Sequence, residues 1–294
     1  MPITTQPELY LVKAFTDRLE GGNAAGVVLH ADALQKEQKQ RIAAGLGLSE
    51  TAFVSASEVG DVKVEFFTPN RQIPHCGHAT VATFGLLLHK GLVKGPEAVK
   101  ESIEGPRLIN LIHNKVYQSQ LAPKYTALEA AGVSAEEVAR SLGLPEDYSF
   151  TTAPVIGNTG VSFLLIQLPS EKVLKELQPV QEQIAAVSDR LDLVGYYVFT
   201  TEAGEADATT RMFAPGYGIP EESATGMAAG PLACYLHDFG GVKKESFLIR
   251  QGYLMEPASP SQIEVQLQLN EQAKISGLQA GGPAYVVKRL ELEC

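Results

Sequence analysis

The stretch FTPNRQIPHCGHATVA at residues 67–82 has a counterpart later in the chain, FAPGYGIPEESATGMA at residues 213–228. Phe, Pro, Ile, Pro and Ala coincide between the two stretches at a constant offset of 146 residues, the distance from Phe67 to Phe213. Because this offset is close to half of the 294 residues, a duplicated half-chain is the simplest explanation. In each stretch a strand that ends in Phe-x-Pro leads through a turn into an apolar helix.

Those two helices, expected at residues 79–90 and 227–239, have no wide polar face. A helix that is apolar on nearly every side must be surrounded by protein, and in a strand-rich chain a curved sheet can surround it. The sequence therefore predicts an α+β fold with two pseudo-symmetric domains, each a barrel-like, mostly antiparallel sheet wrapped around a central helix. We expect the domains at residues 1–122 and 130–287, with residues 288–294 able to pack onto the first.

Alternating segments rich in β-branched residues predict most of the strands, and a few longer segments predict further helices. The strands are expected at residues 9–15, 62–67, 162–168, 196–200, 262–267 and 284–290, and the further helices at residues 36–45, 135–142 and 173–188.

Composition narrows the function classes. The formal net charge of −10 repels phosphate backbones, so nucleic acid is not an expected partner. No apolar run approaches the ~20 residues that cross a bilayer, so no membrane partner is expected. The N-terminal residues show no secretory pattern, which favours the cytoplasm. Three widely spaced cysteines argue against a disulfide framework and against a zinc site, so no metal is expected.

The two turn–helix junctions, residues 76–80 and 222–226, are the first candidate site. The first backbone N–H groups of a helix have no partner within the helix, and they attract carboxylates. Two such ends facing one cleft would hold a small anionic metabolite. The alternative is that the Gly and Thr residues only cap two structural helices.

A lone carboxylate, Glu50, lies between a helix-like segment and an apolar strand in the run Ser49-Glu50-Thr51-Ala52-Phe53. Partial burial at the entry to a strand suits a carboxyl group that both takes and returns a proton. The alternative is an ordinary capping or surface glutamate.

Several motifs occur in the order typical of one enzyme family. They are residues 22–28 (GNAAGVV), 49–53 (SETAF), 66–69 (FFTP), 73–80 (IPHCGHAT), 224–226 (ATG) and 282–287 (GPAYVV). With these motifs the chain resembles the PhzF-like family of phenazine-biosynthesis-type isomerases, which are similar to diaminopimelate epimerases in fold. The resemblance spans nearly the whole chain.

The resemblance implies a biosynthetic isomerase that needs neither metal nor organic cofactor, is a homodimer, and has its active site in the cleft between its two domains. It makes Glu50 the general acid/base that moves a proton between carbons of a small carboxylate-bearing metabolite. Dihydroaromatic acids belong to this class of metabolite. His78 and Glu222 would assist in the chemistry. The substrate contacts would come from Asn23, Cys76, Gly77, Thr80, Thr225, Gly226 and Met227.

Four positions depart from the family pattern. Glu222 stands where the family usually has Asp, Ser223 replaces a Pro, Met227 replaces a Ser, and Ala24 replaces a Pro. Because these positions fall on the expected cleft, they indicate a substrate related to the phenazine precursor but different from it.

Two other functions stay open. An amino-acid racemase or epimerase of the same fold would use Cys76 with Glu222, which the offset of 146 residues places at matching positions. A non-catalytic small-molecule-binding protein would keep the cleft without turnover.

Overall fold

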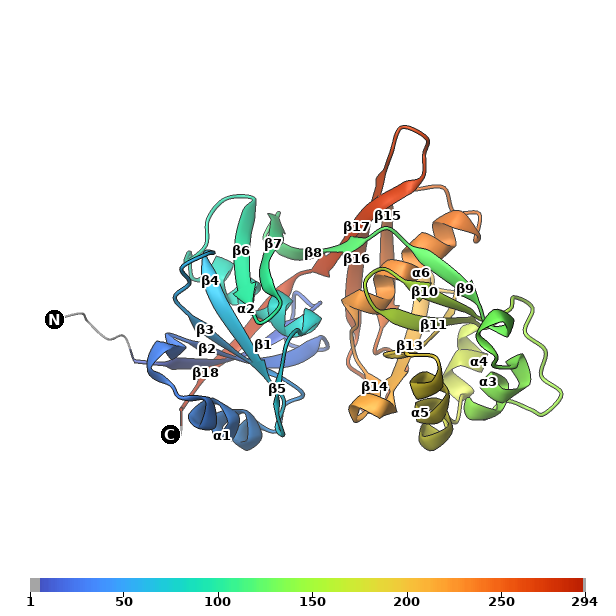
Figure 1. The fold of residues 1–294 in the computed structure, drawn as a ribbon, viewed down its shortest axis with the longest axis horizontal. Coiled ribbons are helices and arrows are strands. Elements are labelled where there is room, and N and C mark those ends of the chain that lie inside the picture. The colour runs from blue at the N-terminus through green and yellow to red at the C-terminus, as the bar shows by residue number, and fades with distance from the viewer. Residues whose placement is uncertain (1–5, 293–294) are drawn as a thin grey trace. The chain divides into compact units, whose positions relative to one another are not determined.

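A computed structural model describes residues 6–292 of the chain. The chain divides into two compact units (Figure 1). The first unit comprises the chain up to Ser119 together with the chain from Gly281 onward, and the second comprises Gln120–Ala280. The predicted boundary near residue 122 lies close to this division, but residues 281–287 belong to the first unit rather than the second. The reason is the last strand, β18 (Ala284–Leu290), which pairs antiparallel with β1 (Glu8–Ala14).

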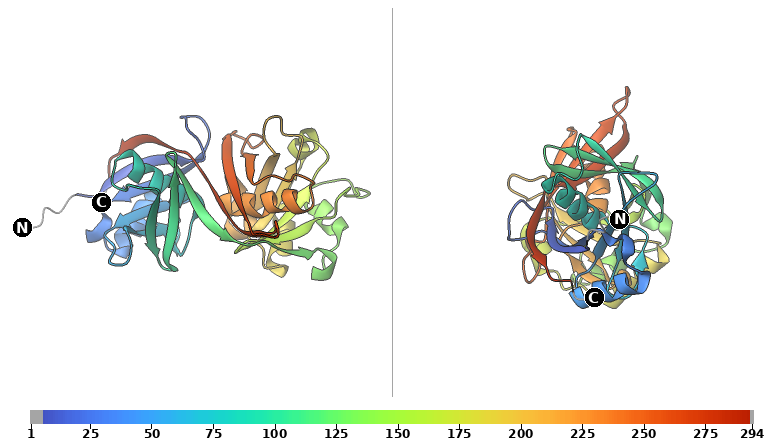
Figure 2. Two further views of the ribbon diagram at one scale, coloured as in Figure 1. Left: turned by 90° about the horizontal axis from the view of Figure 1, so that it is seen from above. Right: turned by 90° about the vertical axis from the view of Figure 1, so that its left-hand side faces the viewer.

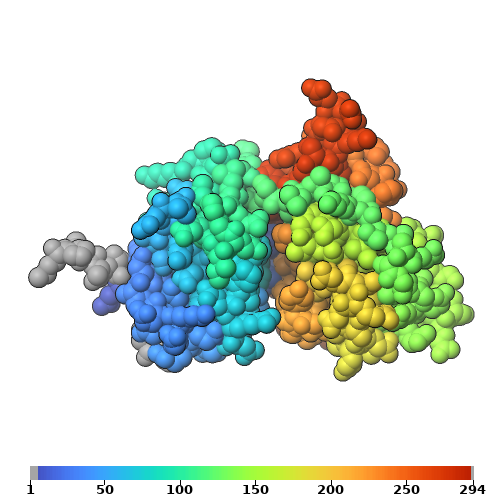
Figure 3. Space-filling view, in the orientation of Figure 1, coloured from blue at the N-terminus to red at the C-terminus, as the bar shows by residue number. Residues whose placement is uncertain are grey.

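In the first unit, strands surround one buried helix, α2 (Gly77–His89). The backbone of α2 packs closely on β18, because a Cβ at Gly85 would come within 2.3 Å of the Ala284 Cβ. Helix α1 lies on the outside of the unit (Figures 1 and 3). The remaining elements up to the unit boundary are β2 (Asn23–Leu29), α1 (Lys36–Leu46), β3 (Thr51–Ser55), β4 (Val62–Phe67), β5 (Gln72–Ile73), β6 (Glu97–Ser102), β7 (Gly105–Ile112) and β8 (Lys115–Leu121), with a 3-10 turn at Ala31–Ala33.

The second unit repeats this plan around helix α6 (Gly226–Asp238), whose residues from Ala228 to His237 are buried. Figure 2 shows α6, in orange, against the strands of its own unit. The unit also contains β9 (Lys124–Ala127), α3 (Ala135–Ser141), β10 (Val155–Asn158), β11 (Ser162–Gln167), α4 (Glu171–Glu176), α5 (Gln181–Arg190), β12 (Gly195–Thr200), β13 (Ala208–Ala214), β14 (Ile219–Glu222), β15 (Ser246–Gln251), β16 (Ser261–Leu269) and β17 (Ile275–Gly282), with 3-10 turns at Glu129–Ala131 and Pro215–Tyr217.

Strand pairing follows the same order in both units. β2 and β3 pair parallel, as do β11 and β12, and the strand that follows each pair, β4 or β13, runs antiparallel to its neighbour. β4 then pairs parallel with β6, and β13 pairs parallel with β15. The predicted α+β fold, with two pseudo-symmetric, mostly antiparallel sheets around central helices, is confirmed.

One predicted helix is wrong. The segment at residues 173–188 forms two helices, α4 and α5, rather than one. Pro179 lies between them, and a proline cannot continue a helix from the preceding turn because it lacks an N–H group and restricts the residue before it. Within the described residues, no helix is long and apolar enough to cross a membrane.

Candidate active site

Glu50 is held at the entry to β3. Its backbone carbonyl accepts a hydrogen bond from Gly26 N–H on β2 (3.2 Å), which fixes the residue against the neighbouring strand. The residue is only 7% exposed. The sequence predicts partial burial at this position. The structure places the carboxylate deeper than that, and deeper than an ordinary surface or capping glutamate.

His78 faces Glu50 from the first turn of α2. Its Nε2 lies 3.2 Å from Glu50 Oε2, and the histidine is also only 7% exposed. The two atoms do not meet in hydrogen-bond geometry, and neither has a hydrogen-bond partner among the described residues. Buried polar atoms are nearly always hydrogen-bonded, so such a pair is typical of a site that binds a polar ligand.

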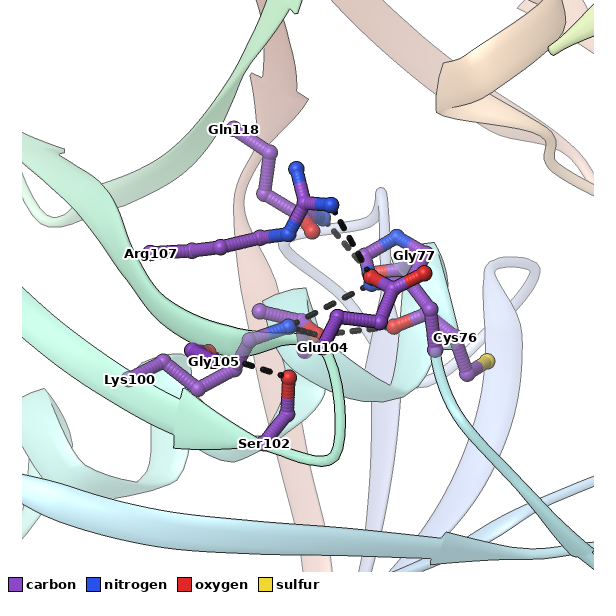
Figure 4. A network of polar contacts seen from close by, with 10 residues as sticks. Cys76, Gly77, Lys100, Ser102, Glu104, Gly105, Arg107 and Gln118 are labelled. Atoms are coloured by element: carbon purple, nitrogen blue, oxygen red, sulfur yellow. Dashed lines mark hydrogen bonds and ion pairs between the residues drawn. The ribbon is translucent and has the colours of Figure 1, made fainter. Parts of the chain in front are cut away.

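The N-terminus of α2 is fixed by hydrogen bonds from its own unit. Thr80 is fully buried, and its N–H and its hydroxyl both donate to the Cys76 carbonyl, at 3.1 and 2.7 Å. Gln118 Nε2 donates to the Gly77 carbonyl at 2.8 Å (Figure 4). These contacts set the direction in which Cys76 and His78 point.

Cys76 completes a row of three buried groups. It is the N-cap residue of α2, and its Sγ lies 3.6 Å from His78 Nδ1. Ligating atoms of Glu50, Cys76 and His78 all lie within 4.8 Å of one another, which would suit a metal ion. However, the imidazole ring presents one nitrogen to the thiol and the other to the carboxylate. In a metal site, one and the same ring nitrogen would have to face the ion together with the thiol and the carboxylate. The arrangement therefore resembles a hydrogen-bonding chain from thiol to imidazole to carboxylate more than a metal centre.

The second unit holds the other predicted residues. Glu222 ends β14, and Thr225 is the N-cap of α6. A buried amide, Gln251, organises this turn: its Nε2 donates to the Glu222 carbonyl (2.8 Å) and to Thr225 Oγ1 (3.1 Å), while its Oε1 accepts from Thr225 N–H (3.1 Å) and from the Tyr197 hydroxyl (3.0 Å).

Gly226 and Met227 follow in the first turn of α6. The Gly226 carbonyl accepts a hydrogen bond from Gln120 Nε2 at 3.0 Å. Pro231 lies inside the helix, and since proline has no N–H, the Met227 carbonyl loses the bond that a helix would give it. Met227 is half-buried.

A family model described as "Phenazine biosynthesis-like protein" (PhzC-PhzF) matches residues 12–289. The chain belongs to this family. An uncharacterised isomerase of Escherichia coli strain K12, YddE, is 31% identical over 92% of this chain and 94% of its own length. The trans-2,3-dihydro-3-hydroxyanthranilate isomerase of Pseudomonas chlororaphis is 30% identical over 79% of this chain and 81% of its own.

Solved structures agree. The PhzF-family protein of Bacillus anthracis superposes with a TM-score of 0.86 at 26% identity, covering 97% of this chain and 99% of its own. A hydroxyproline epimerase of Agrobacterium vitis superposes with a TM-score of 0.58 at 14% identity, covering 97% and 91%, which shows a shared fold only. The predicted family and its diaminopimelate epimerase-like fold are therefore confirmed, and the chain is an enzyme, an isomerase of the PhzF family.

The predicted residues form two groups, one in each unit. Glu50, Cys76, Gly77, His78 and Thr80 gather at the N-terminus of α2. Asn23 lies buried at the start of β2 in the same unit. Glu222, Thr225, Gly226 and Met227 gather at the N-terminus of α6. The prediction that both groups serve one substrate in an interdomain cleft stays a prediction.

Sequence reasoning missed two buried polar residues at these sites, Lys100 on β6 and Gln251 on β15. A signal was present in both strands. Ala98, Lys100 and Ser102 share one face of β6, and Phe247, Ile249 and Gln251 share one face of β15, and all six are buried. The period of two would have placed both polar side chains inward.

Proposed function

We propose that this isomerase moves a proton between two carbons of a small carboxylate-bearing metabolite, with Glu50 as the general acid/base. The observation that carries the proposal is the pair formed by Glu50 and His78, 3.2 Å apart, buried, and without hydrogen-bond partners among the described residues. A carboxyl group without a hydrogen-bond partner of its own is available to a substrate that enters the site.

The reaction balances without any added group. The Glu50 carboxylate removes a proton from an sp³ carbon, the electron pair shifts along the conjugated system, and the protonated Glu50 returns the proton to another carbon. Product and substrate then have the same composition, as an isomerase requires. His78, with its Nε2 beside Glu50, would orient the Glu50 carboxyl group. It would also stabilise the Glu50 carboxylate once that group has returned its proton to the substrate.

The proposed substrate class is supported by sequence similarity to a relative that is named for its substrate. The relative from Pseudomonas chlororaphis is named for a dihydro-hydroxyanthranilate, a carboxylate on a partly reduced ring. Met227 and Glu222 depart from the family pattern, so we propose a related carboxylate rather than that compound. A homodimer in the cytoplasm, without a cofactor, stays the expectation.

Proton NMR in heavy water tests the proposal. A panel of dihydroaromatic and amino-acid carboxylates is incubated with the wild type, Glu50→Gln and Glu58→Gln, an exposed glutamate of the same unit that serves as the matched control. Loss of a C–H signal or a shifted double bond with the wild type and Glu58→Gln, but not with Glu50→Gln, is the expected result. Exchange that continues in Glu50→Gln would overturn the assignment.

The racemase alternative rests on one observation, the approach of the Cys76 sulfur to His78. The duplication does not support its second partner, because the two helices have their N-caps at Cys76 and Thr225, 149 residues apart. Three extra residues precede α6, so Cys76 matches Thr225 rather than Glu222. Exchange in the same NMR experiment that survives Glu50→Gln and disappears in Cys76→Ser would favour the racemase.

A further inference from the structure

Lys100 occupies a position in the core of the first unit where a cation is unexpected. The residue is 0% exposed. Its Nζ donates to Thr80 Oγ1 (3.2 Å), lies 3.4 Å from His75 Nδ1 and lies 5.1 Å from the centroid of the Phe66 ring. These partners are a hydroxyl, an imidazole and an aromatic ring, none of which carries a full negative charge to balance an ammonium group.

The second unit shows that the fold does not need this cation. Phe67 and Phe213 stand at matching places, so the ladders that join β4 to β6 and β13 to β15 place Lys100 and Ile249 at equivalent positions. The cross-strand neighbours match too: Arg107 stands opposite Lys100, and Ile263 stands opposite Ile249. An isoleucine fills the same buried position, so packing alone does not explain Lys100.

Lys100 is tied to the Cys76 segment by hydrogen bonds, because the Thr80 hydroxyl that accepts from its Nζ donates in turn to the Cys76 carbonyl. Burial lowers the pKa of Lys100 to about 8, and attraction of the ammonium group to the Cys76 sulfur and to the Glu104 carboxylate opposes that effect. Cys76 is also the N-cap of a 13-residue helix, where the helix dipole favours negative charge. His78 Nδ1 lies 3.6 Å from the sulfur and can take its proton, while Glu50 beside Nε2 stabilises the resulting imidazolium.

We propose that Cys76 forms a thiolate paired with the His78 imidazolium, that it is a reaction site for soft electrophiles, and that Lys100 is the positioning residue which stabilises it. The proton moves from Sγ to His78 Nδ1, so the net charge of Glu50, Cys76, His78 and Lys100 does not change. Such thiolate–imidazolium pairs react with alkylating agents far below the pH at which an ordinary thiol does. The inference does not depend on the substrate proposed above.

The other charged groups near the pair are balanced or neutral. Glu104 and Arg107 form an ion pair with each other at 3.1 Å. Burial, aided by the charges of Lys100 and Arg107, lowers the pKa of His75 to about 3, so this ring is neutral at physiological pH. Lys100 and His78 are therefore the groups whose substitution tests the proposal.

Alkylation by iodoacetamide tests the proposal. In a Cys294→Ser background, the rate of modification of each remaining cysteine is measured by peptide mass spectrometry as a function of pH. The thiolate sulfur forms a bond to carbon as the carbon–iodine bond breaks and iodide leaves. We expect a midpoint for Cys76 at least one pH unit below the ~8.5 of an ordinary thiol. Cys234 is the internal control, because burial raises its pKa to about 12 and it should not react while the chain is folded.

Lys100→Met separates the role of the cation from that of the histidine. This variant is expected to raise the Cys76 midpoint by about one unit, which is a tenfold slower reaction at neutral pH. Lys94→Met, at an exposed position of the same unit, should leave it unchanged. If reaction of Cys234 shows that Lys100→Met is unfolded, Lys100→Gln replaces it, and Lys100→Arg should keep the low midpoint. An ordinary midpoint in the wild type, an unreactive Cys76, or equal midpoints in the Lys100 and Lys94 variants would each overturn the proposal.

Discussion

The two units share one plan but differ in the polar groups at equivalent positions. In the first unit Glu50 precedes β3, and in the second the equivalent position, set by the pairing of Thr51 with Phe67 and of Tyr196 with Phe213, is Gly195. A side chain there is excluded, since a Cβ at Gly195 would lie 2.2 Å from the Phe213 carbonyl oxygen. The second unit therefore has no carboxylate at the place of the proposed base.

The helix N-termini differ in the same way. Counting from the N-caps Cys76 and Thr225, His78 corresponds to Met227. The first unit thus has a thiol and an imidazole where the second has a hydroxyl and a thioether. The second unit also has Gln251, a neutral amide whose hydrogen bonds fix the Glu222–Thr225 turn.

This difference indicates that the duplicated fold separates two tasks. A scaffold of strands around a helix places an N-terminus at the same point in each unit. At that point the first unit has a thiol and an imidazole beside a buried carboxylate, and the second has a hydroxyl, a thioether and a buried amide that fixes the turn. Variants that exchange features between the units test whether this division is real.

The largest effect is expected from the carboxylates. Glu50→Gln should lower kcat by about 10²–10⁴-fold, because general acid–base catalysis contributes that much. Glu222→Gln should cost less than about tenfold in kcat and act mainly on KM, since a positioning contact is worth about one hydrogen bond. Isomerase assays on the substrate found by NMR measure both. Equal losses in kcat would show that the second unit also supplies an acid/base group.

A smaller loss is expected when the first unit is given the residue of the second. His78→Met should lower kcat by roughly ten- to a hundredfold, the value of a hydrogen bond to a charged group, because the approach of His78 to Glu50 is expected to tighten into such a bond once substrate is bound. The variant replaces the imidazole beside Glu50 with an apolar side chain of similar size. The pH profile of kcat distinguishes this role from a structural one: the profile should shift in His78→Met and keep its shape in Cys234→Ala. An unchanged profile would assign His78 to capping.

In the second unit, substitution of Gln251 should lower the free energy of unfolding rather than the catalytic rate. Gln251→Leu removes the hydrogen bonds that Gln251 makes to the Thr225 N–H, the Glu222 carbonyl and the Tyr197 hydroxyl, at a cost of about 1–3 kcal/mol for each bond whose loss is not compensated. Urea denaturation measures the free energy of unfolding. Gln262→Leu, exposed on the neighbouring strand β16, is the control and should change it by less than about 0.5 kcal/mol. Equal effects would remove the case for an organising amide.

The sequence was sufficient for the duplication and the family, because these depend on local patterns, and the first-unit site residues stay predictions. The motif from Ile73 to Thr80 and the repeat at Phe213 lie within single stretches of chain. The constant offset was not sufficient at the helix starts, because three added residues before α6 shift the register without changing the strand pairs. Pairings such as Cys76 with Glu222 need the backbone positions that only the structure supplies.

Lys100 and Gln251 show a second limit. Their inward direction follows from alternation along β6 and β15, but the groups they contact come from distant segments. Lys100 meets Thr80 across 20 residues, and Gln251 meets Thr225 across 26. Since buried lysine and buried glutamine residues are uncommon, the residue type alone predicts an exposed position for both.

The smallest expected effect concerns His75, which has no histidine counterpart in the second unit. Its folded pKa of about 3 lies below the unfolded value of 6.5, so the unfolded chain binds the extra proton as the pH falls below 6.5. The free energy of unfolding should therefore decrease from pH 6.5 downward until the pH passes about 3. With 24% of the side chain exposed, the share of His75 at pH 5 is at most about 2 kcal/mol.

Urea denaturation at pH 7 and pH 5 isolates this share, because carboxylates contribute equally to the wild type and to His75→Gln. The loss of stability between the two pH values should be smaller in His75→Gln than in the wild type, while His113→Asn, at an exposed turn, should match the wild type. If His75→Gln loses as much stability as the wild type, the ring is not held neutral. Burial and the charge of Lys100 would then act on His75 less strongly than its position indicates, and the electrostatic contrast between the two units would be weaker.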